Sequence, residues 1–183
     1  MRYILVQLCN ILENGYLSLK TDIDGNNLPS TQTKIHFIFI PFCIIGIAYW
    51  LEINLSNSID TILTTLSIFT ALIFGVLFIV PERFSKRIDT LSQKKGDINQ
   101  NYLIRFHNFT KKFVQQTSFI IVLSILNIVL LLIQKIISNE NGILILSAIN
   151  CSLFYILLIF ILIILVNIYI LLMDDVNINK DKI

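Results

Sequence analysis

The feature that most constrains this sequence is its last apolar stretch, which runs from Ile143 to Met173 without a charged residue. A hydrocarbon core about 30 Å thick is crossed by about 20 apolar residues in a helix, so this stretch is long enough to span a bilayer. It also contains no Gly or Pro, which favours one long, tilted helix over two short re-entrant segments. The stretch therefore predicts a membrane protein.

Three further segments have the same apolar character, at 35–53, 60–80 and 117–137. The composition agrees, because the chain is 55% hydrophobic and only 14% charged, whereas soluble domains have about 25% charged residues. We predict an all-α, integral membrane four-helix bundle. Spans 1 and 2 are expected within residues 35–80, and spans 3 and 4 within residues 117–173.

The charges between the spans predict the orientation of the chain. The loop between spans 2 and 3 contains eight basic residues: Arg83, Lys86, Arg87, Lys94, Lys95, Arg105, Lys111 and Lys112. The other two connections together contain one lysine, Lys135. Because Lys and Arg remain on the cytoplasmic side, the middle loop and both termini are predicted to be cytoplasmic, with the spans in the bacterial inner membrane.

The parts outside the spans are predicted to form three cytoplasmic segments. Residues 1–34 are an N-terminal amphipathic helix followed by a turn region, and Asn14-Gly15 is expected to end that helix. Residues 81–116 form a basic helical hairpin that extends from spans 2 and 3. Residues 174–183 form a tail.

The hairpin is predicted from its spacing. Pro81 suits a helix start or a kink, and Lys95-Gly96-Asp97 is a turn signal. An aromatic stripe at helical spacing then follows, and its helix can continue into span 3: Tyr102, Phe106, Phe109 and Phe113. Three interpretations of the hairpin remain open: a loop that only sets topology and packs on itself, a surface for anionic lipid heads, or a docking surface for a soluble cytoplasmic protein.

Two faces of the spans carry small or polar residues. Span 2 has Thr64, Ser67, Ala71 and Gly75, and span 3 has Ser124, Asn127 and Gln134. Small residues allow close helix packing, and polar side chains often bond neighbouring helices, so one interpretation is packing within a subunit or a homo-oligomer. The other interpretation is the lining of a water-filled path in an oligomer.

Residues for chemistry are sparse. His36 and His107 have no cysteine or carboxylate at metal-ligand spacing, and no nucleophile is found beside a base. The three cysteines are too scattered for a metal site or a disulfide framework. We therefore expect no enzyme activity, cofactor or metal, and find no direct signature of nucleic-acid binding.

Four spans in 183 residues, together with a basic helical loop from Pro81 to Gln116, resemble the small membrane subunits of bacterial antiphage defence systems, such as the four-span subunit of Kiwa. The resemblance is one of layout over the whole chain, and it assigns no residue a role. It implies an oligomeric membrane subunit, a sensor or effector, that engages a cytoplasmic partner through its hairpin. Two alternatives stay open: a pore that depolarises the membrane, and an assembly or structural subunit of a larger membrane complex.

Overall fold

The computed structural model describes residues 2–21, 29–93 and 100–180. Every regular element within these ranges is a helix, which confirms the predicted all-α class. Three of the helices are long: α4 (Ile59–Gln93), α5 (Gln100–Ile136) and α6 (Glu140–Lys180). Their most apolar segments, Ser56–Ile79, Phe106–Ile136 and Glu140–Ile170, are each long and apolar enough to cross a membrane.

The segment predicted as span 1 is shorter. It is built from α2 (Ser30–Lys34), the π-helical segment η2 (Ile35–Phe39) and α3 (Ile40–Trp50), and its apolar part is Ile35–Trp50. Proline cannot donate a backbone hydrogen bond, and the wide π turn lies just before Pro41, where the Ile40 N–H donates to the Ile35 carbonyl. The helix ends at Trp50, before the predicted end at Ile53.

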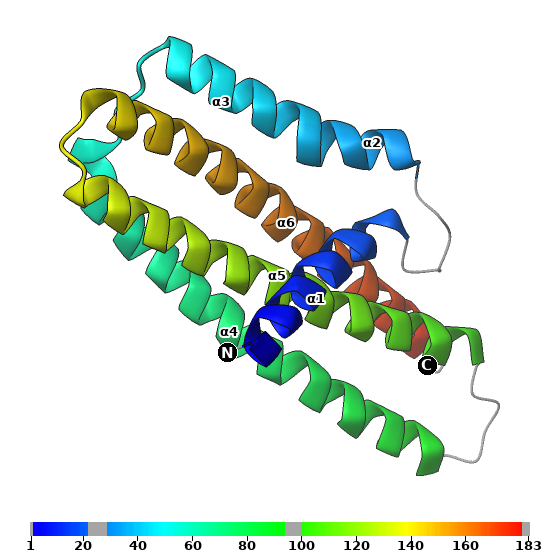
Figure 1. Cartoon of the computed structure of the whole chain (residues 1–183). Coiled ribbons are helices and arrows are strands. Elements are labelled where there is room, and N and C mark those ends of the chain that lie inside the picture. Colours follow the sequence, from blue (N-terminus) through cyan, green and yellow to red (C-terminus); the bar gives the residue numbers. More distant parts are fainter. Residues whose placement is uncertain (1, 22–28, 94–99, 181–183) are drawn as a thin grey trace.

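The helices lie side by side in the order α3, α6, α5, α4 (Figure 1). Consecutive helices α5 and α6 are neighbours, joined by the short stretch 137–139, whereas α3 and α4 lie at opposite ends of the row. The link between α3 and α4 includes the short helix η3 (Ser56–Ser58). Helices α5 and α6 are therefore covered on both sides, and α3 and α4 present an open outer side.

Helix α1 (Arg2–Leu17) crosses α5 on one face of the row (Figure 1). The predicted end of this helix at Asn14-Gly15 is wrong, because the helix continues to Leu17 and into η1 (Ser18–Lys20). Gly15 instead allows α1 to approach α5 closely, since a Cβ added at this position would lie 2.5 Å from the Cβ of Phe119. The glycine allows α1 to contact α5 directly.

The main hydrophobic core lies between α5 and α6, with contributions from α4 and η2. Ile120, Leu131 and Phe160 are fully buried in it. Phe160 contacts two further rings, Phe119 at 4.5 Å and Phe37 at 5.1 Å between centroids. This aromatic contact joins η2, α5 and α6 at the level where α1 crosses.

The helices on either side of the predicted turn continue out of the apolar segments. Helix α4 runs through Pro81 without a new start, and α5 is one continuous helix from Gln100 into its apolar part, a continuity that the sequence predicts. The turn at Lys95-Gly96-Asp97 lies outside the described residues. At the end of the chain, α6 extends to Lys180, so helix occupies much of the segment predicted as a tail.

Candidate functional site

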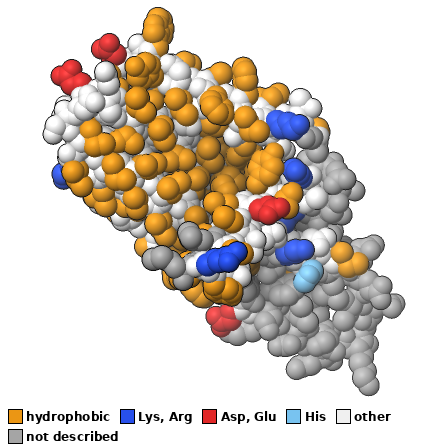
Figure 2. Space-filling view, viewed as in Figure 1, with side chains coloured by type: hydrophobic (Ala, Val, Ile, Leu, Met, Phe, Trp, Pro, Cys, Tyr) orange, Lys and Arg blue, Asp and Glu red, His pale blue; other side chains and the backbone are white. Residues whose placement is uncertain are grey.

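The described residues combine a largely apolar surface with polar side chains buried beside the hydrophobic core. Large apolar residues are exposed on every long helix, for example Leu72 and Leu165, each 62% exposed. Figure 2 shows a face covered mainly by hydrophobic side chains, with Lys and Arg gathered toward one end. In the described part of α5 from Gln116 onward and of α6, eight polar residues are buried: Gln116, Thr117, Ser124, Asn127, Gln134, Ser147, Asn150 and Ser152. We call this buried row the α5–α6 seam.

One end of the seam is a connected hydrogen-bond network. The Gln134 side chain donates from Nε2 to Ser147 Oγ at 2.9 Å and accepts at Oε1 from Asn150 Nδ2 at 3.0 Å. The backbone N–H of Leu55, in the link between α3 and α4, also donates to Ser147 Oγ at 3.2 Å. The network therefore fixes α5, α6 and this link to one another.

Two amides of the seam retain unsatisfied atoms. Neither Asn127 Nδ2 nor Asn127 Oδ1 has a hydrogen-bond partner, and Asn150 Oδ1 has none. An unsatisfied buried amide costs free energy because its hydrogen bonds to water are lost without replacement. Asn127 is thus a destabilising residue in the single chain.

The other end of the seam is more loosely joined. Asn167 Nδ2 of α6 lies 3.4 Å from Gln116 Oε1 of α5, a long hydrogen bond. Thr117 Oγ1 donates to the Phe113 carbonyl within its own helix at 2.6 Å. The predicted residues Ser124, Asn127 and Gln134 are all buried in the same interior. The α6 partners of Gln134, which are Ser147 and Asn150, were not predicted. The signal for these partners is two polar residues, Ser147 and Asn150, three positions apart in a mostly apolar segment.

The second predicted face lies elsewhere. Thr64, Ser67, Ala71 and Gly75 are all exposed on α4. Thr64 Oγ1 donates to the Asp60 carbonyl at 2.8 Å within the helix, and a Cβ added at Gly75 would meet nothing within 4 Å. The structure therefore does not bring this face together with Ser124, Asn127 and Gln134.

The basic residues predicted on the hairpin are described only in part. Lys94 and Lys95 lie outside the described residues, and the side chains of Arg83, Lys86, Arg87 and Arg105 are not described. Lys111 is exposed, whereas Lys112 is buried and its ammonium donates to the Thr21 carbonyl. The two adjacent lysines thus have different surroundings.

Two residues of the aromatic stripe pack against α6, a contact that the sequence did not indicate. Phe109 and Phe113 are buried and stack at 5.9 Å between centroids. They contact Ile164, Ile168 and Ile170 of α6. The long α6 helix therefore supports this part of α5.

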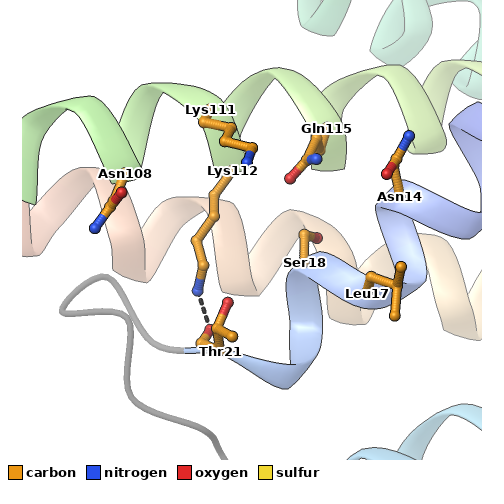
Figure 3. Close-up of a pocket in the computed structure, with 8 residues that line it drawn as sticks. All are labelled: Asn14, Leu17, Ser18, Thr21, Asn108, Lys111, Lys112 and Gln115. Atoms are coloured by element: carbon orange, nitrogen blue, oxygen red, sulfur yellow. Dashed lines mark hydrogen bonds between the residues drawn. The ribbon is translucent and has the colours of Figure 1, made fainter.

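A pocket of about 310 Å³ lies between α1 and α5. It is lined by Asn14, Leu17, Ser18, Thr21, Asn108, Lys111, Lys112 and Gln115. In Figure 3 the Lys112 side chain runs across this space to Thr21, between Asn108 on one side and Ser18 on the other. We call this space the α1–α5 pocket. The pocket residues on α1 were not predicted, because the spacing of residues in the sequence does not show that α1 packs against α5.

Replacing Asn127 by Leu should stabilise the single chain. Leucine has a similar volume and no polar atoms, so the variant removes two unsatisfied buried groups from the seam. We expect the free energy of unfolding to rise by about 1 kcal/mol, measured by SDS titration in mixed micelles. A loss of stability would contradict the conclusion that Asn127 has no hydrogen-bond partner, and it would indicate a partner in a second subunit.

Comparisons with models of known protein families, with curated proteins and with solved structures found no match for this chain.

Proposed function

We propose that the chain is a non-enzymatic subunit of a bacterial inner membrane, which crosses the bilayer four times as a helix bundle and has both termini in the cytoplasm. The observation that carries this proposal is the buried polar seam beneath an apolar surface. Such a surface is costly in water, whereas lipid tails surround it without a penalty. Three crossings use α4, α5 and α6, and the fourth uses the shorter apolar helix Ile35–Trp50.

The length of this shorter helix is compatible with a crossing. Its helical continuation through α2 begins at Ser30, and Trp50 at its far end is 80% exposed, as expected for an aromatic residue at a membrane surface. A span that is slightly short is accommodated by local thinning of the bilayer or by flanking polar residues. Four crossings place both termini on the side of the basic loop.

We further propose that the subunit forms homo-oligomers and engages a soluble cytoplasmic partner through the basic hairpin at 81–116, as a sensor or effector in antiphage defence. The exposed small-residue face of α4 supports oligomer formation, because such faces allow close helix packing in lipid. The excess of Lys and Arg on the hairpin supports attraction of an acidic partner surface.

Charge reversal at the predicted turn of the hairpin should abolish binding of the partner. In the variant with Lys94→Glu and Lys95→Glu, we expect capture of the cytoplasmic partner to fall to background, measured by crosslinking and co-purification from the source cells. The control variant with Lys20→Glu and Lys34→Glu changes the net charge by the same amount and should still capture the partner. Lys112 is left unchanged because it is buried against Thr21.

The same two variants test the orientation of the chain in the membrane. The hairpin variant keeps Arg83, Lys86 and Arg87 in the loop, so its topology should be unchanged. A phosphatase or fluorescent reporter fused at position 95 should report the cytoplasm in both variants. Equal capture by the two variants would exclude the hairpin as the docking surface, and a periplasmic reporter would exclude the four-span topology.

A pore is the second candidate function, and Asn127 favours it. A buried amide without a partner in the single chain gains hydrogen bonds if it faces water or another subunit in an oligomer. In planar bilayers, the wild-type protein should then conduct, and the Asn127→Leu variant should not. Absence of conductance by a protein shown to be oligomeric would exclude this function.

A further inference from the structure

We propose that the α1–α5 pocket binds the phosphate-bearing headgroup of an anionic phospholipid. The inference rests on the proposed membrane placement and is independent of the soluble partner. The pocket volume of about 310 Å³ falls at the lower end of the range, about 300–1,000 Å³, of pockets that bind small ligands. A single headgroup is a ligand of suitable size.

The lining of the pocket suits an anion. Lys111 and Lys112 are adjacent on α5, and each lies three or four positions from Asn108 and from Gln115, so the four side chains lie toward one side of the helix. Asn14 and Ser18 of the α1 segment face them across the pocket (Figure 3). The described lining residues carry ammonium, amide and hydroxyl groups, and none of these described residues is acidic. The Ser18 hydroxyl donates to the Gly15 carbonyl at 2.6 Å, so the ammonium and amide groups are the donors for an anion.

The two lysines take different parts in this site. Lys112 is buried and its ammonium contacts the Thr21 carbonyl, which holds the end of the α1 segment against α5 and shapes the base of the pocket. Lys111 is exposed, so its ammonium is accessible to a phosphate oxygen. A charge-assisted hydrogen bond from an ammonium is stronger than a neutral one, and therefore Lys111 is the main contact to the ligand.

The position of the pocket identifies the anion as a lipid. Lys111 and Lys135 lie on the continuous helix α5, roughly 36 Å apart given a rise of about 1.5 Å per residue. Lys135 pairs with Asp60 at 2.8 Å on an exposed surface at the other end of the apolar segment. A bilayer has a hydrocarbon core of about 30 Å and a full thickness of about 40–45 Å, so both lysines lie at headgroup depth.

Apolar surface for the lipid tails adjoins the pocket. Leu17 lines the pocket and is 42% exposed. The preceding turns of α1 expose further apolar side chains, including Val6 and Leu12. A lipid bound by its headgroup could place its acyl chains along this surface, whereas a soluble phosphate would leave it unused.

The test is a lipid titration of the purified full-length protein in detergent, read by native mass spectrometry and thermal shift. Phosphatidylglycerol should bind more tightly than phosphatidylcholine with the same acyl chains. Lys111→Gln and Asn108→Ala should each weaken phosphatidylglycerol binding by about tenfold, the effect of losing one charged or polar contact. Lys34→Gln, an exposed lysine outside the pocket, should leave binding unchanged.

Each alternative outcome has a defined meaning. Equal binding of the two lipids, or equal phosphatidylglycerol binding by wild type and both pocket variants, would overturn the inference. Glycerol 3-phosphate that binds as tightly as phosphatidylglycerol would overturn the lipid assignment in favour of a soluble phosphate. If the protein enters phosphatidylcholine nanodiscs but shows no preference for phosphatidylglycerol, only this inference is refuted. If the protein stays monodisperse without detergent, the membrane placement is refuted as well.

Discussion

Replacing Gln134 by Leu is expected to lower the free energy of unfolding by about 2–3 kcal/mol. Gln134 bonds both Ser147 and Asn150 in the buried seam, and the variant leaves Asn150 without any side-chain partner. A buried polar group that loses its partner costs about 1–3 kcal/mol. SDS titration in mixed micelles measures the difference from wild type.

A second substitution separates the lost hydrogen bonds from a change of shape. The double variant Gln134→Leu and Asn150→Leu removes both amides, so most of the lost stability should return, because replacing both partners by apolar groups is close to neutral. Two independent, additive losses would show that packing and not the amide pair accounts for the effect. Asn127→Leu, seven residues earlier on the same face of α5, should have the opposite sign.

Replacing Gly15 by Ala is expected to destabilise the protein by about 1–3 kcal/mol, the cost of overpacking a well-packed contact. The added methyl group would lie 2.5 Å from Phe119 Cβ, an atom next to the backbone that a side-chain rotation does not move. Helix α1 must therefore move away from α5, which also disturbs the Lys112 contact with Thr21. The free energy of unfolding and the rate of proteolysis near residue 21 report the change.

The matched control is Gly75→Ala on α4. A Cβ at Gly75 meets nothing within 4 Å in the single chain, so in the monomer this variant should gain about 0.5–1 kcal/mol from the better helix propensity of alanine. Opposite signs at the two glycines would establish that close approach, and not helix propensity, governs Gly15. A gain of stability at both positions would contradict the contact between α1 and α5.

Properties that depend on one stretch of chain could be predicted from the sequence. The long apolar helices follow from uninterrupted runs of Ile, Leu and Phe, and the continuity of α5 follows from the spacing of its phenylalanines. Ser124, Asn127 and Gln134 could also be singled out, because polar residues are rare in such helices. Their burial in the chain depends on the neighbours that fold against them.

Properties that depend on contacts between distant segments were not accessible. The return of α1 to α5 is determined by the shapes of Gly15 and Phe119, which are separated by most of the chain. The same holds for the contact between Lys112 and the Thr21 carbonyl, since these two residues are far apart in the sequence. Gly15 was mistaken for a helix end because a glycine at a helix terminus and a glycine at a helix crossing look alike in sequence.

The hydrogen bond from the Leu55 N–H to Ser147 has a consequence for the link between α3 and α4. Since α3 and α4 lie at opposite ends of the row, the stretch that joins them passes over the ends of α5 and α6 (Figure 1). The Leu55 bond fastens this stretch directly to the first buried hydroxyl of the seam. This backbone hydrogen bond therefore helps to hold the link between α3 and α4 against the end of the seam that contains Ser147.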